Sequence, residues 1–314
     1  MWILKRRSNL ALIIGIVLLL ILTASWHLTL APSIIAGEME KIDATSTLEG
    51  ILRPSILLGL GTGEIPIQVK VHVYVTGVKG DNIILRMDIN MTRIDTGEML
   101  PDFSSNSTYV INKFSRENIW GAPEADKNRT GYSILYPMHL KPGQDIFNVW
   151  LDQLDVNATL EFKEEIIEEG IKLYKYYVNK TLTKRLWIEK IGERNCILTS
   201  TKTILIEPLS GVLAYTENET FSLTISGSEW GIPDIPLVYL TYKSTAEDKL
   251  KGITEAKNLY DGVQLLELYI PMITEILIIT LAICLAFNVL RIKRRKPLKR
   301  NQVPDASTSR FLHF

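Results

Sequence analysis

Cysteine is nearly absent from this chain, with two among 314 residues. Cys196 lies in the middle of the chain and Cys284 in an apolar run near its end, so no disulfide within one folded domain is expected. Small secreted domains often depend on disulfides, but residues 27–268 are numerous enough to bury a core without them. Histidine is also rare, and no cluster of His and Cys has the spacing of metal ligands. The sequence therefore predicts neither a metal nor a cofactor.

Sequence motifs of enzymes are missing as well. There is no Gly-x-Ser-x-Gly elbow for a hydrolase nucleophile. The stretch 59–64 (GLGTGE) lacks the third glycine of a dinucleotide loop, and no Gly-Lys-Ser/Thr follows it. The carboxylate run 164–169 (EEIIEE) resembles neither a calcium loop, which needs an internal glycine, nor a catalytic pair, because such runs usually lie in solvated loops or at strand ends. We therefore expect a protein that is not an enzyme.

Two apolar runs bracket the chain, residues 9–26 and 268–290, and each has basic residues at its outer end. A bilayer core of about 30 Å needs about 20 helical residues, so both runs are expected to be transmembrane helices. Clustered Lys and Arg stay on the cytoplasmic side, which places residues 1–8 and 291–314 inside and 27–267 outside. The sequence thus predicts a two-pass protein of the cell membrane, with both termini cytoplasmic and lipids around its spans.

Two points of this topology stay open. The first run also resembles a cleavable signal peptide, with Thr23-Ala24-Ser25 as a small-residue cleavage site. Its apolar core, Leu10–Leu22, is long for a signal peptide and favours a retained span. The basic segment Arg291–Arg300 either contacts anionic lipid head groups or only stops translocation.

Six N-x-S/T sequons lie between the apolar runs, and none lies in the predicted cytoplasmic ends. Their asparagines are Asn90, Asn106, Asn128, Asn157, Asn179 and Asn218. This confinement predicts a glycosylated outer domain, with bulky hydrated sugars on several faces. Residues 27–268 carry 24 basic and 33 acidic side chains, a net charge of −9. Because nucleic-acid binding needs a basic surface, we expect no nucleic-acid partner.

The outer segment has the pattern of a β-rich domain. In residues 67–75 the odd positions are apolar, and after the Lys79-Gly80-Asp81 turn Leu85–Met91 alternates in the same way, which predicts a hairpin. Helices are expected at 33–49 and 246–267. Further strands are expected at Ser133–Tyr136, Ile171–Val178, Leu182–Ile191, Cys196–Ile206, Val212–Thr216, Phe221–Ile225 and Leu237–Tyr242. The predicted fold class is a membrane-anchored, mainly β ectodomain, an antiparallel sandwich or barrel-like α+β domain, flanked by two transmembrane helices.

Glu275 is the ionisable residue that lies deepest in the second apolar run, seven residues from its start. An ionisable group at such a depth is costly and tends to face a partner. The nearest polar residues of the first run are Thr23 and Ser25, which predicts a hydrogen bond that pairs the two helices. The alternative is that the hydrophobic core begins later and Glu275 lies near the interface.

Five short motifs between residues 109 and 212 occur in a familiar order. They are Tyr109-Val-Ile-Asn-Lys113, Gly131-Tyr-Ser-Ile-Leu-Tyr-Pro137, Phe147-Asn-Val-Trp150, Glu168-Glu-Gly-Ile-Lys-Leu-Tyr-Lys-Tyr176 and Ile206-Glu-Pro-Leu-Ser-Gly-Val212. This order resembles the PorA-type porin family of actinobacteria and archaea, largely a domain of unknown function. The resemblance implies two short terminal spans, a β-rich ectodomain and no catalytic residues. The chain departs from the family pattern at Met138, where an aromatic is usual, and after Trp150, where Asp-Pro is usual.

Two function classes follow from these observations. The first is a non-enzymatic surface protein with a structural role in the envelope or a ligand-binding role, whose partner is another envelope protein or a lipid. The second is transport. The layout of two spans and a glycosylated ectodomain also resembles the class B scavenger receptors, which implies a lipid tunnel. Because the spans are helical, a porin-like pore would require a homo-oligomer of helices rather than a barrel.

Overall fold

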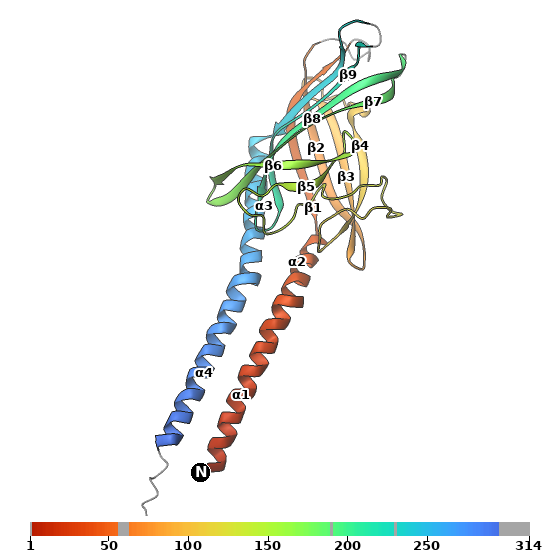
Figure 1. Cartoon of the computed structure of the whole chain (residues 1–314). Helices are drawn as coiled ribbons and strands as arrows, with labels where there is room; N and C mark the ends of the chain where they lie inside the picture. The colour runs from red at the N-terminus through yellow and green to blue at the C-terminus, as the bar shows by residue number, and fades with distance from the viewer. Residues whose placement is uncertain (1, 56–62, 189–190, 229–230, 295–314) are drawn as a thin grey trace, which may run out of the picture. The chain divides into compact units, whose positions relative to one another are not determined.

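The computed structural model describes residues 2–55, 63–188, 191–228 and 231–294 (Figure 1). Within it the chain forms two compact units. One comprises Met1–Leu28 and Tyr269–Phe314, and the other comprises Thr29–Leu268. Residues 301–314, in the predicted cytoplasmic end, and most of the stretch 59–64 lie outside the described residues.

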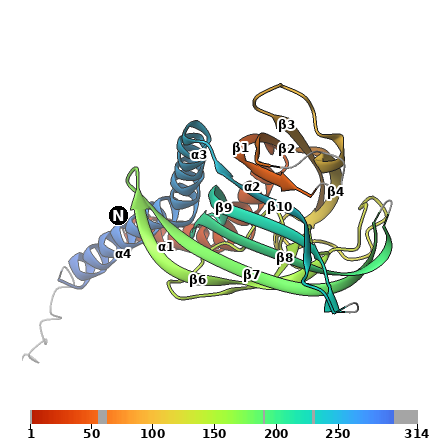
Figure 2. The same cartoon turned by 90° about the horizontal axis from the view of Figure 1, so that it is seen from above.

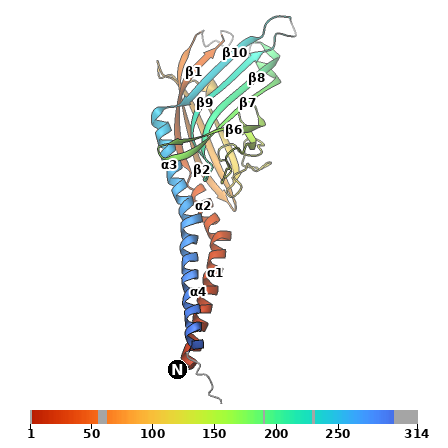
Figure 3. The same cartoon turned by 60° about the vertical axis from the view of Figure 1, so that its left-hand side comes forward.

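The first unit is a pair of helices, α1 (Trp2–Ser25) and α4 (Ile270–Arg294). At 1.5 Å per residue, helices of 24 and 25 residues are roughly 36–38 Å long, more than the bilayer core of about 30 Å. Among the described residues, two helices are long and apolar enough to span a membrane, and their most apolar windows have mean hydropathies of 2.2 and 2.4. The start of α1 and the end of α4 lie at the same end of this pair (Figures 1 and 3).

The second unit contains one antiparallel sheet of ten strands in the order β4-β3-β2-β1-β10-β9-β8-β7-β6-β5. The strands are β1 (Asp43–Pro54), β2 (Ile65–Lys79), β3 (Asn82–Arg93), β4 (Ser105–Asn112), β5 (Ile146–Leu151), β6 (Val156–Glu168), β7 (Ile171–Ile188), β8 (Gly192–Glu207), β9 (Val212–Ile225) and β10 (Ile235–Ser244). The chain builds one half of the sheet outward from β1, crosses to the far edge at β5, and returns strand by strand to β10. The mainly β, antiparallel character predicted from the sequence is confirmed.

The predicted hairpin is β2 and β3. Val71 pairs with Ile89 and Val75 with Leu85, as the alternation requires. Leu85 is fully buried, while Asn90, on the opposite face of the strand, is exposed. Since successive side chains of a strand point to opposite faces, the alternation of apolar and polar residues is sufficient to predict which face is buried.

The first predicted helix is wrong over most of its length. A short helix, α2 (Ala31–Met39), is followed by β1, so the expected helix 33–49 holds for its first part only. β1 has β-branched Thr45 and Thr47 and lies between two partners, with Leu48 opposite Val69 of β2 and Ser244 of β10. These distant partners override the local helical spacing.

Other strand boundaries also need correction. Two pairs of expected strands are single long strands, β7 and β9, and β4, β5 and β6 were not predicted. The segment Ser133–Tyr136, expected to be a strand, lies in the irregular connection between β4 and β5. β6 escapes prediction because it contains most of the carboxylate run, residues 164–168. Its glutamates pair with lysines of neighbouring elements, for example Glu165 with Lys172 of β7 at 2.8 Å.

The main core lies on one face of the sheet, which is strongly curved (Figure 2). Buried side chains from both halves of the sheet belong to this core, such as Ile67 of β2 and Tyr176 of β7. The connection between β4 and β5 also contributes Tyr136 and Leu140 to this cluster. The inner face of the sheet is therefore filled with packed side chains.

The opposite face carries the helix α3 (Ala246–Gln264), close to the predicted 246–267. Thr245 caps its first turn by accepting a hydrogen bond from the backbone N–H of Asp248. Its apolar stripe places Ile253 and Ala256 on a small outer core with Leu205 of β8 and Ala214 of β9. A π-helical turn, Leu265–Tyr269, precedes α4.

A glycine sets how closely α3 approaches β9. A Cβ at Gly252 would lie 1.8 Å from the carbonyl oxygen of Ala214, whereas a Cβ at Gly262 of the same helix would meet nothing within 4 Å. We expect Gly252→Ala to lift α3 from the sheet and lower the free energy of unfolding by about 1–3 kcal/mol. Gly262→Ala should instead raise it by up to about 1 kcal/mol, because alanine is the better helix former. Denaturant unfolding of both variants checks this difference in sign, and equal effects would contradict the close approach.

The segment between β4 and β5 joins the two edges of the sheet. Asn118 bridges to Ile111 of β4, and its backbone N–H donates to the carbonyl oxygen of Gly131 at 2.7 Å. One residue later, Tyr132 bridges to Val149 of β5. A continuous series of backbone hydrogen bonds therefore leads from one edge strand to the other.

The same segment is held against the turn between β8 and β9. The buried carboxylate of Glu207 accepts hydrogen bonds from the backbone N–H groups of Leu209 and Ser210 at 2.9 and 2.6 Å. Arg116, 2% exposed, donates to the carbonyl oxygens of Ser210 and Tyr136. Burial lowers the pKa of Arg116 to about 10, which still leaves it cationic at neutral pH.

Candidate functional site

The six sequon asparagines are all exposed. They lie on β3 (Asn90), β4 (Asn106), the β4–β5 connection (Asn128), β6 (Asn157), β7 (Asn179) and β9 (Asn218). Exposure is what an attached glycan requires. The occupancy of each site stays a prediction.

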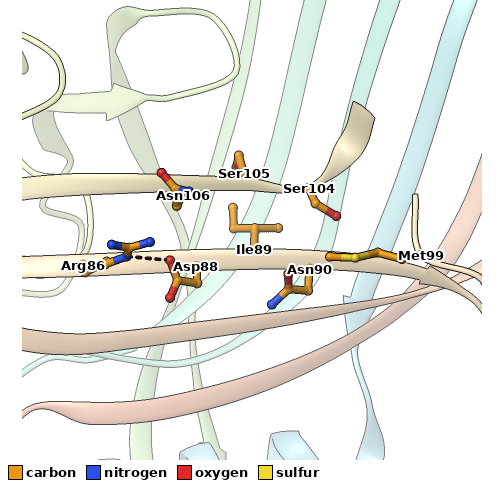
Figure 4. Close-up of a pocket in the computed structure, with 8 residues that line it drawn as sticks. All are labelled: Arg86, Asp88, Ile89, Asn90, Met99, Ser104, Ser105 and Asn106. Carbon is orange, nitrogen blue, oxygen red and sulfur yellow. Dashed lines mark hydrogen bonds and ion pairs between the residues drawn. The ribbon is translucent and has the colours of Figure 1, made fainter. Parts of the chain in front are cut away.

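Two of these asparagines line one hollow on the outer face of β3 and β4, of about 350 Å³ (Figure 4). We call it the β3–β4 hollow. Its lining consists of Arg86, Asp88, Ile89, Asn90, Met99, Ser104, Ser105 and Asn106. Apart from Ile89 and Met99 these residues are polar, so the hollow suits a hydroxyl-rich ligand rather than a lipid chain.

The orientation of its charged groups is fixed by hydrogen bonds. Arg86 Nε donates to Asp88 Oδ1 at 2.9 Å, and the Tyr74 hydroxyl donates to Asp88 Oδ2 at 3.2 Å. The hydrogen bond to Asp88 raises the pKa of Arg86 above its usual value. At neutral pH the hollow therefore presents one guanidinium, one aspartate and several amides and hydroxyls.

The two helices share a hydroxyl contact at the residue before Glu275. The Thr23 hydroxyl lies 3.2 Å from the hydroxyl of Thr274, while the side chain of Glu275 is exposed. Successive residues of a helix point about 100° apart, so the two neighbours face different directions. Ser25 ends α1. The hydrogen bond from Glu275 to the first helix stays a prediction.

A polar cluster that was not predicted from the sequence crosses the inner face of the sheet. Glu219 of β9 lies directly between Lys202 of β8 and Tyr242 of β10. Lys202 Nζ is 3.1 Å from Glu219 Oε2, and the two side chains are 23% and 7% exposed. Gln153, from the β5–β6 turn, donates to Glu219, and Ser200 donates to Gln153 at 3.3 Å. We call these five residues the inner polar cluster.

The charge of Lys202 is stabilised by its carboxylate partner. Burial alone would lower the pKa of Lys202, but attraction to Glu219 outweighs it, and the pKa is raised. Burial raises the pKa of Tyr242 well above its usual value, so this hydroxyl stays protonated. The lysine, glutamate and glutamine satisfy one another, which is the arrangement of a structural ion pair rather than of an acid and base poised for catalysis. Charged residues at inward strand positions are the signal that could have revealed it.

A second buried cation fixes the edge of β4. Arg129 lies 4.0 Å over the ring of Tyr109 and donates to Asp152 Oδ1 at 2.8 Å and to Asp126 Oδ1 at 2.6 Å. The Tyr109 hydroxyl also donates to Asp152, at 2.9 Å. Tyr109 belongs to one of the five sequence motifs, so this contact gives that motif a structural role.

A histidine and two glutamates of the carboxylate run, residue types that can bind metals, have partners within the protein. His72 lies 2.7 Å from Asp43 on the outer face. In the carboxylate run, Glu164 pairs with Lys175 and Glu168 pairs with Lys249. Over the described part of the chain, no group of three His, Cys, Asp or Glu side chains could hold a metal ion.

No known family model matches this chain, and no curated protein matches it. Among solved structures it is similar to a 12:0-ACP thioesterase from Umbellularia californica, at 12% identity over 67% of this chain and 75% of that chain, with a TM-score of 0.15.

Proposed function

We propose that this chain is a non-enzymatic cell-surface membrane protein whose β-rich domain, Thr29–Leu268, stands outside the cell in a structural or ligand-binding role. The observation that carries this proposal is the filled inner face of the sheet. Buried residues such as Leu52, Tyr176 and Ile204 pack there, and the β4–β5 connection covers them. A carrier of lipid would need an apolar cavity in this place.

Three further observations support the location. The two apolar helices suit membrane spans, and the start of α1 and the end of α4 lie at one end of the pair. Two clusters of basic residues in the sequence, 5–7 and 291–300, lie next to those ends. The six exposed sequons belong to the other unit. The order of motifs that resembles PorA-type porins agrees with this layout and adds no catalytic residue.

The topology can be tested on intact cells. An epitope tag inserted after Gly80, in the turn between β2 and β3, should bind antibody without permeabilisation, because that turn is exposed. The same tag after Phe314 should bind only after the cells are permeabilised. The reverse pattern, or staining of both tags in intact cells, would overturn the proposed arrangement.

Transport through a lipid tunnel or an oligomeric helical pore is the alternative. Native mass spectrometry of the full chain separates the two functions. One lipid retained per chain after extensive delipidation would favour a carrier, and a ring of several chains would favour a pore. A lipid-free monomer would support the structural role.

A further inference from the structure

The β3–β4 hollow brings together two glycan acceptors that are far apart in sequence. Asn106 of β4 lies opposite Asp88 of β3, and Asn90 follows two residues later on the same face. Diagonal neighbours of an antiparallel pair lie about 7–8 Å apart. Sugars attached to Asn90 and Asn106 would therefore begin in the same hollow.

The hollow offers hydrogen-bonding groups that the protein itself leaves unused. Arg86 uses its Nε for Asp88, and a guanidinium has five N–H donors in all. Within the described residues, no protein group bonds the side chains of Asn90, Asn106 or Ser105. By contrast, the Asn157 amide donates to the Thr130 hydroxyl at 2.6 Å, and the Asn218 carbonyl accepts from Thr241 at 3.1 Å.

The position of the hollow gives a second reason for a covering ligand. β4 is an edge strand, and the β4–β5 connection pairs with it from Thr108 onward. Residues 105–107, next to the hollow, have no further strand beside them in the described structure. Uncovered edge strands are sites of unwanted pairing between chains, and proteins commonly protect them. A bulky polar group at Asn106 would protect this one.

We propose that the β3–β4 hollow holds the innermost sugars of N-linked glycans on Asn90 and Asn106, bound through Arg86 and Asp88. This inference rests on the proposed function, in which the domain is glycosylated outside the cell. A volume of about 350 Å³ lies within the range of small-molecule sites and leaves room for the first sugars. The bound sugars shield the open half of the β4 edge.

Protection from an endoglycosidase tests the proposal. The full chain is produced in a host that attaches high-mannose glycans, and the native protein is treated with endoglycosidase H. Site-resolved glycopeptide mass spectrometry then follows release at Asn90, Asn106 and Asn179, the last on β7 outside the hollow. Release at Asn90 and Asn106 should be about tenfold slower than at Asn179, because the hydrogen bonds that hold these sugars in the hollow must break before the enzyme reaches them.

Two arginine variants separate this role from general stability. Arg86→Met should bring release at both sites to the rate of Asn179, with occupancy and unfolding midpoint unchanged. Arg185→Met, which removes an exposed ion pair with Glu193 on the β7–β8 hairpin, should leave the protection intact. Glycans at all three sites with equal release rates, or glycan at Asn179 alone, would overturn the inference. Lack of glycan at every sequon would instead contradict the proposed function.

Discussion

Gly131→Ala is expected to open the join between the two sheet edges and to lower the free energy of unfolding by roughly 2–5 kcal/mol. Gly131 has a φ of +66°, and a Cβ there would lie 1.7 Å from the carbonyl oxygen of Asn148. The left-handed backbone contributes about 1–2 kcal/mol, and the steric conflict with a backbone atom contributes about 1–3 kcal/mol. To relieve that conflict, Gly131 and Tyr132, which connect Asn118 to β5, would have to move.

Gly121, in the same connection, is the matched control. Its φ is +73°, but a Cβ would meet nothing within 4 Å. Gly121→Ala should therefore lower the free energy of unfolding by only the backbone contribution, about 1–2 kcal/mol. Hydrogen exchange adds a local measurement, because β5 amides should exchange faster in Gly131→Ala and at the native rate in Gly121→Ala. Equal exchange in the two variants would show that the connection does not hold β5.

Lys202→Met is expected to lower the free energy of unfolding by about 3–5 kcal/mol, because it leaves the Glu219 carboxylate buried without its cation. Combined with Glu219→Leu, most of this loss should return, since an apolar pair of similar size often replaces a buried ion pair without a loss of stability. The two single variants and the double variant form a thermodynamic cycle. Denaturant midpoints measured at neutral pH provide the four free energies.

Lys175→Met is the control for this cycle. Lys175 pairs with Glu217 at 2.8 Å and with Glu164 at 3.3 Å on the outer face, where these two glutamate side chains are 44% and 56% exposed, against 7% for Glu219. Pairs with exposed carboxylates should each contribute less than about 1 kcal/mol.

The contribution of Lys202 to the free energy of unfolding should also depend on pH. Since the pKa of Lys202 is raised in the folded protein, its contribution is complete at neutral pH and declines only above the unfolded value of about 10.4. If Lys202→Met lowered the free energy of unfolding by no more than Lys175→Met does, the inner polar cluster would not be a stabilising unit.

The sequence predicted best where the pattern is local. The β2–β3 hairpin follows from strict alternation and a glycine turn, and the structure pairs Val75 with Leu85 accordingly. The buried side of α3 follows from helical spacing, with Ile253, Ala256 and Val263 inward, although Leu250 of the same pattern is exposed. In these elements each residue's environment depends on near neighbours, so periodicity is a sufficient guide.

Prediction failed where distant partners decide the structure. β1 is a strand because β2 and β10 flank it, and β6 tolerates its glutamates because lysines of β7 and α3 lie beside them. The inner polar cluster depends on register across three strands and on bulges in β8–β9 pairing after Thr203 and Leu205. Such bulges shift which residues face inward. The five motifs were recognised as an ordered series, but their mutual contacts, such as Tyr136 with Gly211 at 3.3 Å, come from the fold.

The strand order has a consequence for biosynthesis. β1 has partners on both sides, yet β10 begins 181 residues after the end of β1, at Ile235 after Pro54. At about 5–20 residues per second, a ribosome needs roughly 10–40 s to synthesise the intervening chain. During that interval we expect β1–β4 to form a meander in which β1 is an unpaired edge strand. Chaperones, or another nascent chain, could bind this edge. Nascent chains arrested before β10 should crosslink to chaperones through β1, whereas chains arrested after β10 should have lost this crosslink.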